Sequence, residues 1–395
     1  MKSKDYRGYS SFSYLSPHVD YRVFDMAEER GRVPVHNLGL SEDQEARAQQ
    51  LLAENIVISL HDHPFRLPAR PHELAEYQKE AHVAIGYEGL SRSGLDAVFD
   101  NIGGPAWSWE ATIKDLGMRL CDIAHQNMVH IAYSIDCIRK AHNTGKIAFV
   151  LGLEGAEVIG DDIDRIDILY GLGIRQMGIV YEKENSFGYG LHAVEDRGLT
   201  ELGRRAVRRM NQLGMVIDLS HAGDRTSLDV IEESEFPVLI SHAGAREVWN
   251  TRRMKSDEVI KACAANGGLI GIEAAPHTTI SPRNPRHNIE SVMDHFQYCI
   301  DLVGSSHVTF GPDTFFGDHV GLHNCLNEKL GLDAFFAAGP KFERIEYVSG
   351  LENPAECFPN IVRWLVFNGY SDDQIAEVVG GNTMRILDLI WKVAP

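Results

Sequence analysis

ENIVISLHDHPFRLP, residues 54–68, is the stretch of this sequence that decides the fold. Its apolar run, IVISL at 56–60, is rich in β-branched residues and predicts a buried strand. His61 and His63 end that strand, with Asp62 between them. Because side chains alternate along a strand, the two histidines share one face, where they can bind one metal ion. The alternative is that one histidine packs in the core while the other is solvated.

The composition is that of a globular protein with a large core. The chain has 395 residues, 44% hydrophobic and 24% charged, and α/β barrels often reach this length as one unit. A net charge of −18 argues against nucleic acid or an anionic membrane as the main partner. The six cysteines show no paired spacing, which indicates free thiols in a reducing compartment. Without a secretory h-region, a spanning apolar run or a GPI-type tail, we expect no membrane attachment and a cytoplasmic location.

Strands and helices alternate regularly from residue 147 onward. After the strand at 56–60, the pattern predicts strands over 147–155, 174–181, 215–221, 237–242, 267–274 and 307–313, with helices between them. One more strand within 64–146 would make eight. Such alternation is typical of parallel strands with right-handed crossovers, and the number favours a closed α/β fold, a (β/α)8 TIM-like barrel. A doubly wound open sheet is the alternative, but no Gly-rich phosphate loop follows the first strand.

The domain organisation predicted from this pattern has two parts. Residues 1–40 are polar and aromatic, and we expect an N-terminal arm lying on the body or on a partner subunit. Residues 41–395 form a single barrel domain. It carries an insertion at about 64–110, placed directly after the first strand, which we expect to act as a lid or pocket wall.

Polar residues gather at the carboxyl ends of the predicted strands. In a parallel barrel these ends open on one face, so the side chains converge: they are His61, His63, Glu154, His221, His242 and Asp313. Imidazoles combined with carboxylates suit zinc or a similar transition metal better than magnesium or calcium. Each residue also has a simpler explanation, as a hydrogen-bonded histidine, a solvated acid or a helix cap. Six such coincidences at equivalent positions are hard to credit, so we predict a metal site.

The other histidines are not predicted to be ligands. Four lie in stretches that we predict to be helical, namely His125, His130, His142 and His295. Four more lie in predicted loops and are candidates to face the pocket: His277, His287, His319 and His323.

Several segments together carry a family resemblance. They are LGLEGAE, RRMNQLGMVIDLSHAGD, PVLISHAGAREVWNTRR, ANGGLIGI, HVTFGPD and YSDDQIAEVVGGNTMRIL. In this order the chain resembles the membrane (renal) dipeptidase family of the amidohydrolase superfamily. The resemblance implies a homodimer with two zinc ions per chain. Glu154 would bridge the metals, His221 and His242 would hold one, and His61, His63 and Asp313 the other. It also implies that Arg253, in NTRRM, grips the terminal carboxylate of the substrate, although a surface salt bridge is the alternative.

Three departures from the family pattern concern the site. The family's first motif is usually His-x-Asp, whereas here His63 takes the place of the carboxylate, and Asp62 would be a ligand only if the strand twisted locally. Tyr181 stands where the family has a histidine that stabilises the tetrahedral intermediate, and a phenol brings one hydrogen bond but no charge. GPDTFFGDH carries a second Asp shortly after the first.

The activity implied is that of a metal-dependent dipeptidase. The resemblance implies hydrolysis of the amide bond of small dipeptides, with a D-residue possible on the carboxyl-terminal side, by a hydroxide that bridges the metals. Asp313 would accept and deliver the proton, and Tyr181 would contact the oxyanion and the substrate. One alternative is a superfamily hydrolase acting on a non-peptide amide, N-acyl compound or lactone. Another is a non-catalytic metal-binding protein. A nucleotide-binding oxidoreductase is disfavoured because a Gly-rich fingerprint is missing.

Overall fold

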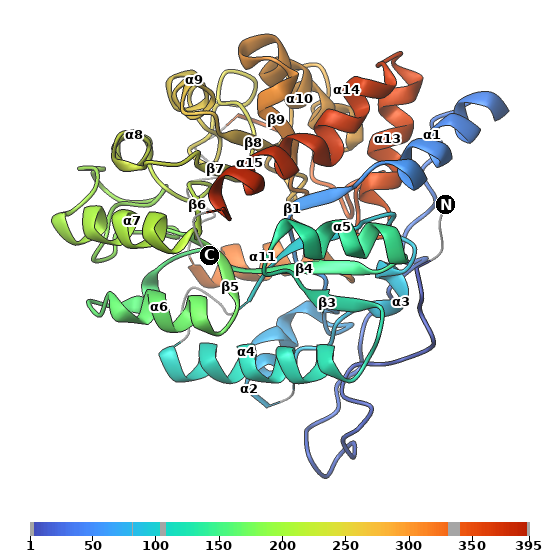
Figure 1. The fold of residues 1–395 in the computed structure, drawn as a ribbon. Coiled ribbons are helices and arrows are strands. Elements are labelled where there is room, and N and C mark those ends of the chain that lie inside the picture. Colours follow the sequence, from blue (N-terminus) through green and yellow to red (C-terminus); the bar gives the residue numbers. More distant parts are fainter. Residues whose placement is uncertain (1–3, 81, 103–107, 331–339, 393–395) are drawn as a thin grey trace.

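Eight parallel strands form a nearly closed barrel in the computed structural model, which describes residues 4–80, 82–102, 108–330 and 340–392 (Figure 1). Seven pairings, each parallel, join neighbours in the order β1-β2-β4-β5-β6-β7-β8-β9. The strands are β1 Ile58–Asp62, β2 Ala97–Asn101, β4 Ile147–Leu153, β5 Ile174–Gly178, β6 Val216–Asp218, β7 Leu239–Ala243, β8 Leu269–Ile272 and β9 Val308–Phe310. The predicted (β/α)8 barrel is therefore confirmed.

The eighth strand is β2, which the sequence pattern did not locate. The expected insertion over 64–110 therefore extends too far, because its residues 97–101 belong to the barrel; residues 81 and 103–107 of that range lie outside the described part. A ninth strand, β3 (Val129–Ile131), pairs with β4 beside the barrel path. It places His130 in a strand, so the prediction that this histidine lies in a helix is wrong.

The barrel closes between β1 and β9 through backbone bonds beyond the ends of these strands. The amide of Asp313 donates to the carbonyl of His61 over 3.0 Å, and the amide of His63 donates to the carbonyl of Thr314, also over 3.0 Å. β1 also contains a bulge. Ser59 pairs with Val98 and Asp62 with Asp100, so β1 advances by three residues where β2 advances by two. Such a bulge changes which face a side chain points to. The closure thus brings the first and last ligand-bearing segments side by side.

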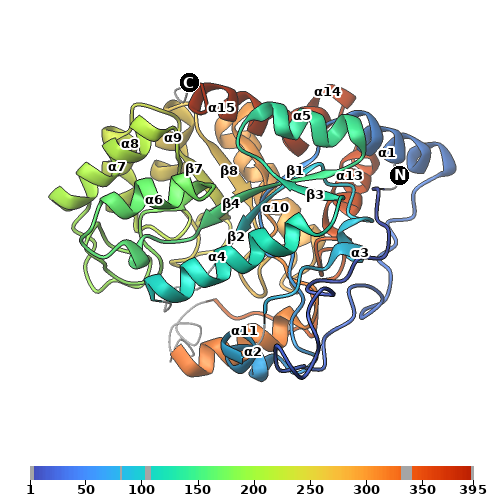
Figure 2. The same ribbon diagram turned by 60° about the horizontal axis from the view of Figure 1, so that its bottom comes forward.

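Helices surround the strands and close the two ends of the barrel. The bounds are α1 Glu42–Glu54, α2 Leu74–Glu80, α3 Tyr87–Leu90, α4 Trp109–Ala124, α5 Ile135–Thr144, α6 Asp164–Gly171, α7 Glu201–Leu213, α8 Asp224–Glu233, α9 Asp257–Ala265, α10 Ile289–Val303, α11 His319–Leu330, α13 Cys357–Phe367, α14 Asp372–Ala376 and α15 Asn382–Ile390. Ser41, Thr200 and Ser371 accept backbone hydrogen bonds at the starts of α1, α7 and α14. Figure 2 shows α11 and α2 together at one end of the barrel and α15 at the other.

The interior of the barrel is apolar at the end where the strands begin. Residues such as Ile58, Ala97 and Leu239 form one buried cluster with Ile386 and Ile390 of α15. Burying this surface stabilises the barrel by about 25 cal/mol per Å² of apolar area. The polar residues lie at the opposite, carboxyl-terminal end, where loops rather than core packing determine their positions.

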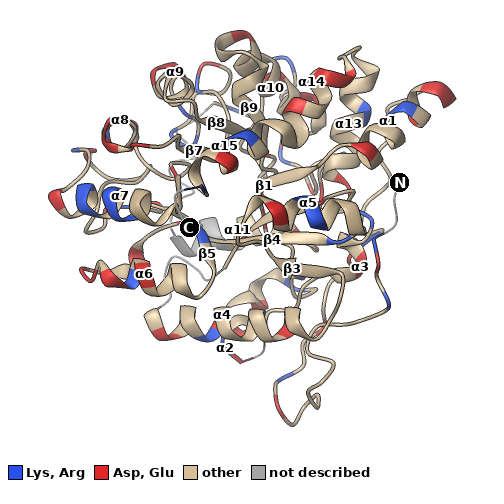
Figure 3. Cartoon of the chain, viewed as in Figure 1, with Lys and Arg blue, Asp and Glu red and all other residues tan. Residues whose placement is uncertain are grey.

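The described part of the N-terminal arm lies along the barrel. Lys4 forms a buried ion pair with Asp96, with 2.6 Å between Nζ and Oδ1, and Tyr9 donates to Asp122 over 2.7 Å. On the outer helices, charged residues of both signs are mixed, as Figure 3 shows. Within the described residues no helix is both long enough and apolar enough to cross a membrane.

Candidate active site

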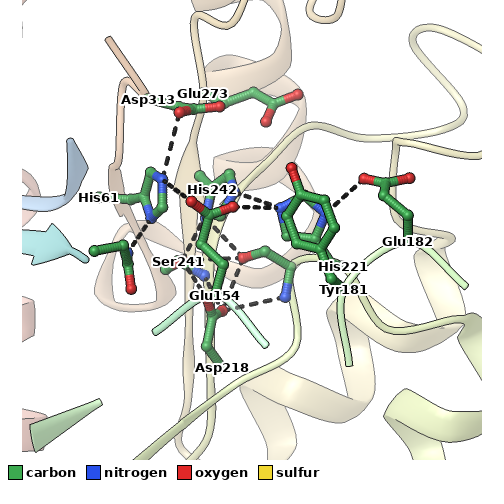
Figure 4. A network of polar contacts seen from close by, with 12 residues as sticks. His61, Glu154, Tyr181, Glu182, Asp218, His221, Ser241, His242, Glu273 and Asp313 are labelled. Carbon is green, nitrogen blue, oxygen red and sulfur yellow. Dashed lines mark hydrogen bonds and ion pairs between the residues drawn. The ribbon is translucent and has the colours of Figure 1, made fainter. Parts of the chain in front are cut away.

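Four of the six predicted ligands, all histidines, surround a fifth, Glu154, which follows β4. On one side, Nε2 of His63 lies 3.3 Å and Nε2 of His61 3.9 Å from Oε1 of Glu154, and the two imidazole nitrogens are 3.2 Å apart. On the other side, Nε2 of His221 lies 3.2 Å from Oε2 of Glu154 and 3.1 Å from Nε2 of His242. Glu154 therefore directs one carboxylate oxygen to each pair of histidines. Figure 4 shows its carboxylate between His61 and His221.

Asp313, the sixth predicted ligand, completes the arrangement from the segment after β9. Its Oδ1 lies 3.4 Å from Nε2 of His61 and 3.2 Å from Nε2 of His63. Its backbone adopts φ +57°, a left-handed conformation that is uncommon outside glycine. The bond from its amide to His61 and those that its neighbour Thr314 makes with Asp62 hold this conformation.

Asp62 points away from the other site residues and supports the loop after β9. Its carboxylate accepts from the hydroxyl of Ser59 over 2.6 Å and from the amide and hydroxyl of Thr314 over 2.9 and 2.7 Å. Burial raises its pKa to about 6, while these hydrogen bonds act in the opposite direction. The structure thus places His63 among the candidate ligands and gives Asp62 a supporting position.

The spacing and chemistry of the donors suit the binding of a transition metal such as zinc. Donor atoms about 2.0–2.1 Å from a tetrahedral zinc ion lie roughly 3.3–3.4 Å from one another. In three overlapping trios all donor atoms lie within 4.8 Å of one another: His61, His63 and Glu154; Glu154, His221 and His242; and His61, His242 and Asp313. Facing Nε2 lone pairs 3.1–3.2 Å apart repel unless a proton or metal ion lies between them.

A second set of residues, not identified from the sequence, orients the histidines. Oε1 of Glu182 lies 2.9 Å from Nδ1 of His221, and its other oxygen lies 2.8 Å from Nε2 of His192. Because Nδ1 of His221 faces a carboxylate, it carries the proton and leaves the Nε2 lone pair for a metal. Glu182 directly follows Tyr181, so its position as an acid near the end of a predicted strand could have identified it as a site residue.

His242 is oriented through a hydroxyl instead of directly by a carboxylate. Its Nδ1 lies 2.7 Å from Oγ of Ser241, which donates to Asp218 over 2.6 Å. Asp218 also accepts from the amide of Ser241 and the hydroxyl of Ser220 (Figure 4). Since Ser241 donates to Asp218, it accepts the Nδ1 proton of His242, which again directs Nε2 to the metal site.

His61, in β1, and His63, just after it, are held differently from each other. Nδ1 of His61 lies 2.6 Å from the side-chain amide of Asn101. Nδ1 of His63 is buried and has no hydrogen-bond partner among the described residues, but its ring stacks on Phe315 with centroids 4.4 Å apart. The histidine that departs from the family pattern is therefore positioned by an aromatic ring.

The electrostatics of the site favour charged carboxylates and release of protons on metal binding. Burial raises the pKa of Asp313, but hydrogen bonds from His61 and His63 outweigh it and hold the pKa well below its usual range. Burial lowers the pKa of His63, yet its hydrogen bonds to Asp313 and Glu154 raise it to about 10. A bound metal displaces such protons because its ligands must be deprotonated.

The two predicted substrate-binding residues lie beside the candidate metal ligands. Tyr181 stacks on His221 with centroids 4.2 Å apart, and burial raises the pKa of its phenol well above the ordinary value. Arg253 does not present a free guanidinium. It pairs with Glu273, a fully buried residue directly after β8, and donates to the carbonyls of His242 and Ser220 over 3.1 and 3.3 Å.

The four remaining candidate pocket histidines surround the ligands without joining them. His319 and His323 lie on α11 rather than in a loop, and His319 packs edge-on against Phe315 with centroids 4.6 Å apart. His277 donates its amide to Nδ1 of His287 over 3.0 Å. Among the described residues none of the four belongs to a group of donors able to hold a metal.

A parallel barrel with histidines and carboxylates converging at the carboxyl ends of its strands defines the class of metal-dependent hydrolases. The sequence model of the membrane dipeptidase family (Peptidase family M19) matches residues 45–328, and the chain belongs to this family.

Two curated fungal relatives support the assignment. Dipeptidase tcpJ of Claviceps purpurea is 27% identical over 71% of this chain and 59% of its own length. An uncharacterized dipeptidase, C965.12, of Schizosaccharomyces pombe is 29% identical over 70% of this chain and 60% of its own. The match thus spans about three fifths of these relatives.

Solved structures share the fold over a larger part of the chain. An amidohydrolase from Pseudomonas aeruginosa has a TM-score of 0.72 and 27% identity, covering 87% of this chain and 99% of its own. A metallo peptidase from Rhodobacter sphaeroides, liganded with a phosphinate mimic of the dipeptide L-Ala-D-Ala, has a TM-score of 0.67 and 20% identity. That match covers 86% of this chain and all of the other.

Proposed function

We propose that this chain is a metal-dependent dipeptidase that binds two zinc ions and hydrolyses the amide bond of small dipeptides. The observation that carries the proposal is the position of Glu154, whose two carboxylate oxygens face two separate pairs of histidines. His221 and His242 would hold one ion, and His61, His63 and Asp313 the other, with Glu154 shared. Family membership and the dipeptide mimic bound by the Rhodobacter sphaeroides structure support the choice of substrate.

The zinc ions would polarise the scissile carbonyl and lower the pKa of water. The residues of the chain supply the proton transfer and the positioning. The carboxylate of Asp313 lies beside His61 and His63, whose hydrogen bonds hold its pKa well below the usual range, so it is charged. As a charged carboxylate among the candidate metal ligands, it would be the base that accepts a proton from the attacking water. It then delivers that proton to the leaving nitrogen.

Tyr181 would stabilise the developing oxyanion. Its phenol stays protonated because burial raises its pKa, so the hydroxyl is a hydrogen-bond donor at neutral pH. Figure 4 shows the ring in front of His221, with the hydroxyl pointing toward the side of the site where Asp313 and Glu273 lie.

The test combines elemental analysis with a dipeptide panel that includes D-residues at the carboxyl-terminal position. Two zinc ions per chain with dipeptide cleavage, and a large loss of kcat in Asp313→Asn with zinc retained, are the expected results. Absence of stoichiometric metal would overturn the site. Near-normal turnover in Asp313→Asn would overturn the assignment of the proton acceptor.

A second candidate is hydrolysis of a non-peptide amide, N-acyl compound or lactone by the same site. The ion pair between Arg253 and Glu273 favours it, because this arginine would otherwise contact the carboxylate of a dipeptide. Metal binding together with inactivity toward every dipeptide would favour this candidate.

The proposal also includes a homodimer in the cytoplasm. Light scattering of the full chain tests the first of these expectations, and fractionation of the source cells tests the second.

A further inference from the structure

The guanidinium of Arg253 is already committed within the protein. Its Nη2 donates to the carbonyl of His242 over 3.1 Å and pairs with the carboxylate of Glu273, while Nη1 donates to the carbonyl of Ser220 over 3.3 Å. Only 17% of the arginine side chain is exposed, and Glu273 is fully buried. These contacts fix Arg253 by the ends of β6, β7 and β8.

The geometry of a guanidinium means that, in this arrangement, Arg253 cannot bind a substrate carboxylate with two hydrogen bonds. A guanidinium has two edges that can bind a carboxylate through two parallel hydrogen bonds. One edge consists of Nη1 and Nη2, and the other of Nε and Nη2, so each edge uses one hydrogen of Nη2. In Arg253 both hydrogens of Nη2 are used, by His242 and Glu273. The hydrogens that remain, on Nη1 and Nε, point to opposite sides and cannot grip one carboxylate together.

The charges around Arg253 act in the same direction. The carboxylates that bear on its guanidinium are those of Glu273, Asp313 and Glu182. A substrate carboxylate at this place would therefore meet an arginine that is already neutralised. Releasing Arg253 would leave the carboxyl of Glu273 fully buried and without its partner, so that it would either stay charged at a high cost or take up a proton.

We propose that Glu273 is a specificity-determining residue, and that the preferred substrates are amides whose leaving side ends in an uncharged group instead of a free carboxylate. Dipeptide amides and N-acyl amines belong to this class. The inference rests on the proposed hydrolysis of an amide bond and ranks its substrates: a free dipeptide would be cleaved less well than its amide. Arg253 would then serve to hold Glu273 and the strand-end carbonyls in place.

The test compares a dipeptide with the same dipeptide carrying a terminal carboxamide, as kcat/KM values for zinc-loaded wild type and Glu273→Gln. Wild type is expected to prefer the carboxamide. The substitution removes the charge that competes for Arg253, so the ratio of free-acid to amide hydrolysis should rise by about tenfold or more. Glu258→Gln, at an exposed position on α9, is the matched control and should leave the ratio unchanged. A smaller rise in Glu273→Gln than about tenfold would overturn the proposal.

A binding measurement separates this inference from the proposed function and needs no variant. Calorimetric titration of zinc-loaded wild type with alanine and with alaninamide compares a free carboxylate with its neutral counterpart. The inference expects the amide to bind at least as tightly, and tighter binding of alanine would overturn it even if Glu273→Gln fails to fold. Inactivity toward both peptide substrates would instead contradict the proposed dipeptidase activity, with the binding comparison still deciding the role of Glu273.

Discussion

Oε1 of Glu182 lies 2.9 Å from Nδ1 of His221, on the side of the imidazole opposite the nitrogen that faces Glu154. This relationship fixes the ring and its tautomer in the way that carboxylates commonly support metal-binding histidines. The same carboxylate also pairs with His192, so one acid ties the loop after β5 to the histidine after β6.

Substituting Glu182 should therefore weaken metal binding without unfolding the protein. In Glu182→Gln the side chain keeps its shape but loses the charge that makes His221 a stronger ligand. We expect zinc affinity to fall by about 10–100-fold, as for comparable supporting residues, measured by titration against a competing chelator. Glu184→Gln, an exposed neighbour, is the control. Equal affinities in the two variants would show that Glu182 does not support the ligand.

The positions of the candidate ligands were predictable from the sequence because each of them lies at, or within three residues of, the carboxyl end of an apolar strand. In a parallel barrel that pattern alone brings Glu154, His221 and Asp313 to one face. Glu182 and Ser241 were not predicted as supporting residues, because their roles depend on which ring nitrogen they meet. Asp218 could have been identified as a supporting residue, because it is a charged residue inside an otherwise apolar strand.

Other features depend on contacts that a single sequence does not encode locally. Strand β2 was missed since its residues AVFDN follow a long segment whose pattern has no clear period. The pairing of Arg253 with Glu273 joins two loops through side chains, and neither residue is unusual within its own segment. Spacing indicates which residues face the site, whereas their partners depend on the packed structure.

Gly178, the last residue of β5, should tolerate no side chain. A Cβ there would lie 1.9 Å from the carbonyl oxygen of Glu154, so Gly178→Ala must displace the backbone that carries the shared carboxylate. We expect a loss of stability of about 1–3 kcal/mol, as for overpacked cores, together with reduced zinc content. Chemical denaturation of the metal-free protein and elemental analysis measure the two effects.

Gly117 provides the control for that substitution. It lies in the interior of α4 with nothing within 4 Å of an added Cβ, and its position is exposed. Gly117→Ala should therefore stabilise the protein by about 0.5–1 kcal/mol and leave zinc content unchanged. Equal effects of the two substitutions would contradict the close approach at Gly178.

Glu352 should make stability depend on pH below neutrality. Burial raises its pKa to about 7, although Arg32, whose Nε lies 2.8 Å from it, opposes the shift. In the unfolded chain the same group titrates near its ordinary 4.5. Between these values the native state holds the proton and the unfolded state does not, so the free energy of unfolding falls as pH rises from about 5 to 7.

Glu352→Gln should remove that contribution. The shift corresponds to about 3 kcal/mol at most, so urea denaturation at pH 5 and pH 7 should show a smaller pH-dependent loss in the variant than in wild type. Glu346→Gln, at an exposed position nearby, should behave like wild type. Identical pH dependence in all three proteins would contradict the raised pKa.

Tyr181→Phe separates the proposed oxyanion contact from a packing role. The stack on His221 needs only the ring, so the variant should fold and bind zinc as wild type does. A hydrogen bond to the oxyanion acts mainly in the transition state, so its loss should lower kcat by about 10²–10³-fold with little change in KM. Tyr133→Phe, whose ring is half exposed, should keep wild-type kinetics. A normal kcat in Tyr181→Phe would show that the hydroxyl does not stabilise the transition state, and that Tyr181 acts only through the packing of its ring.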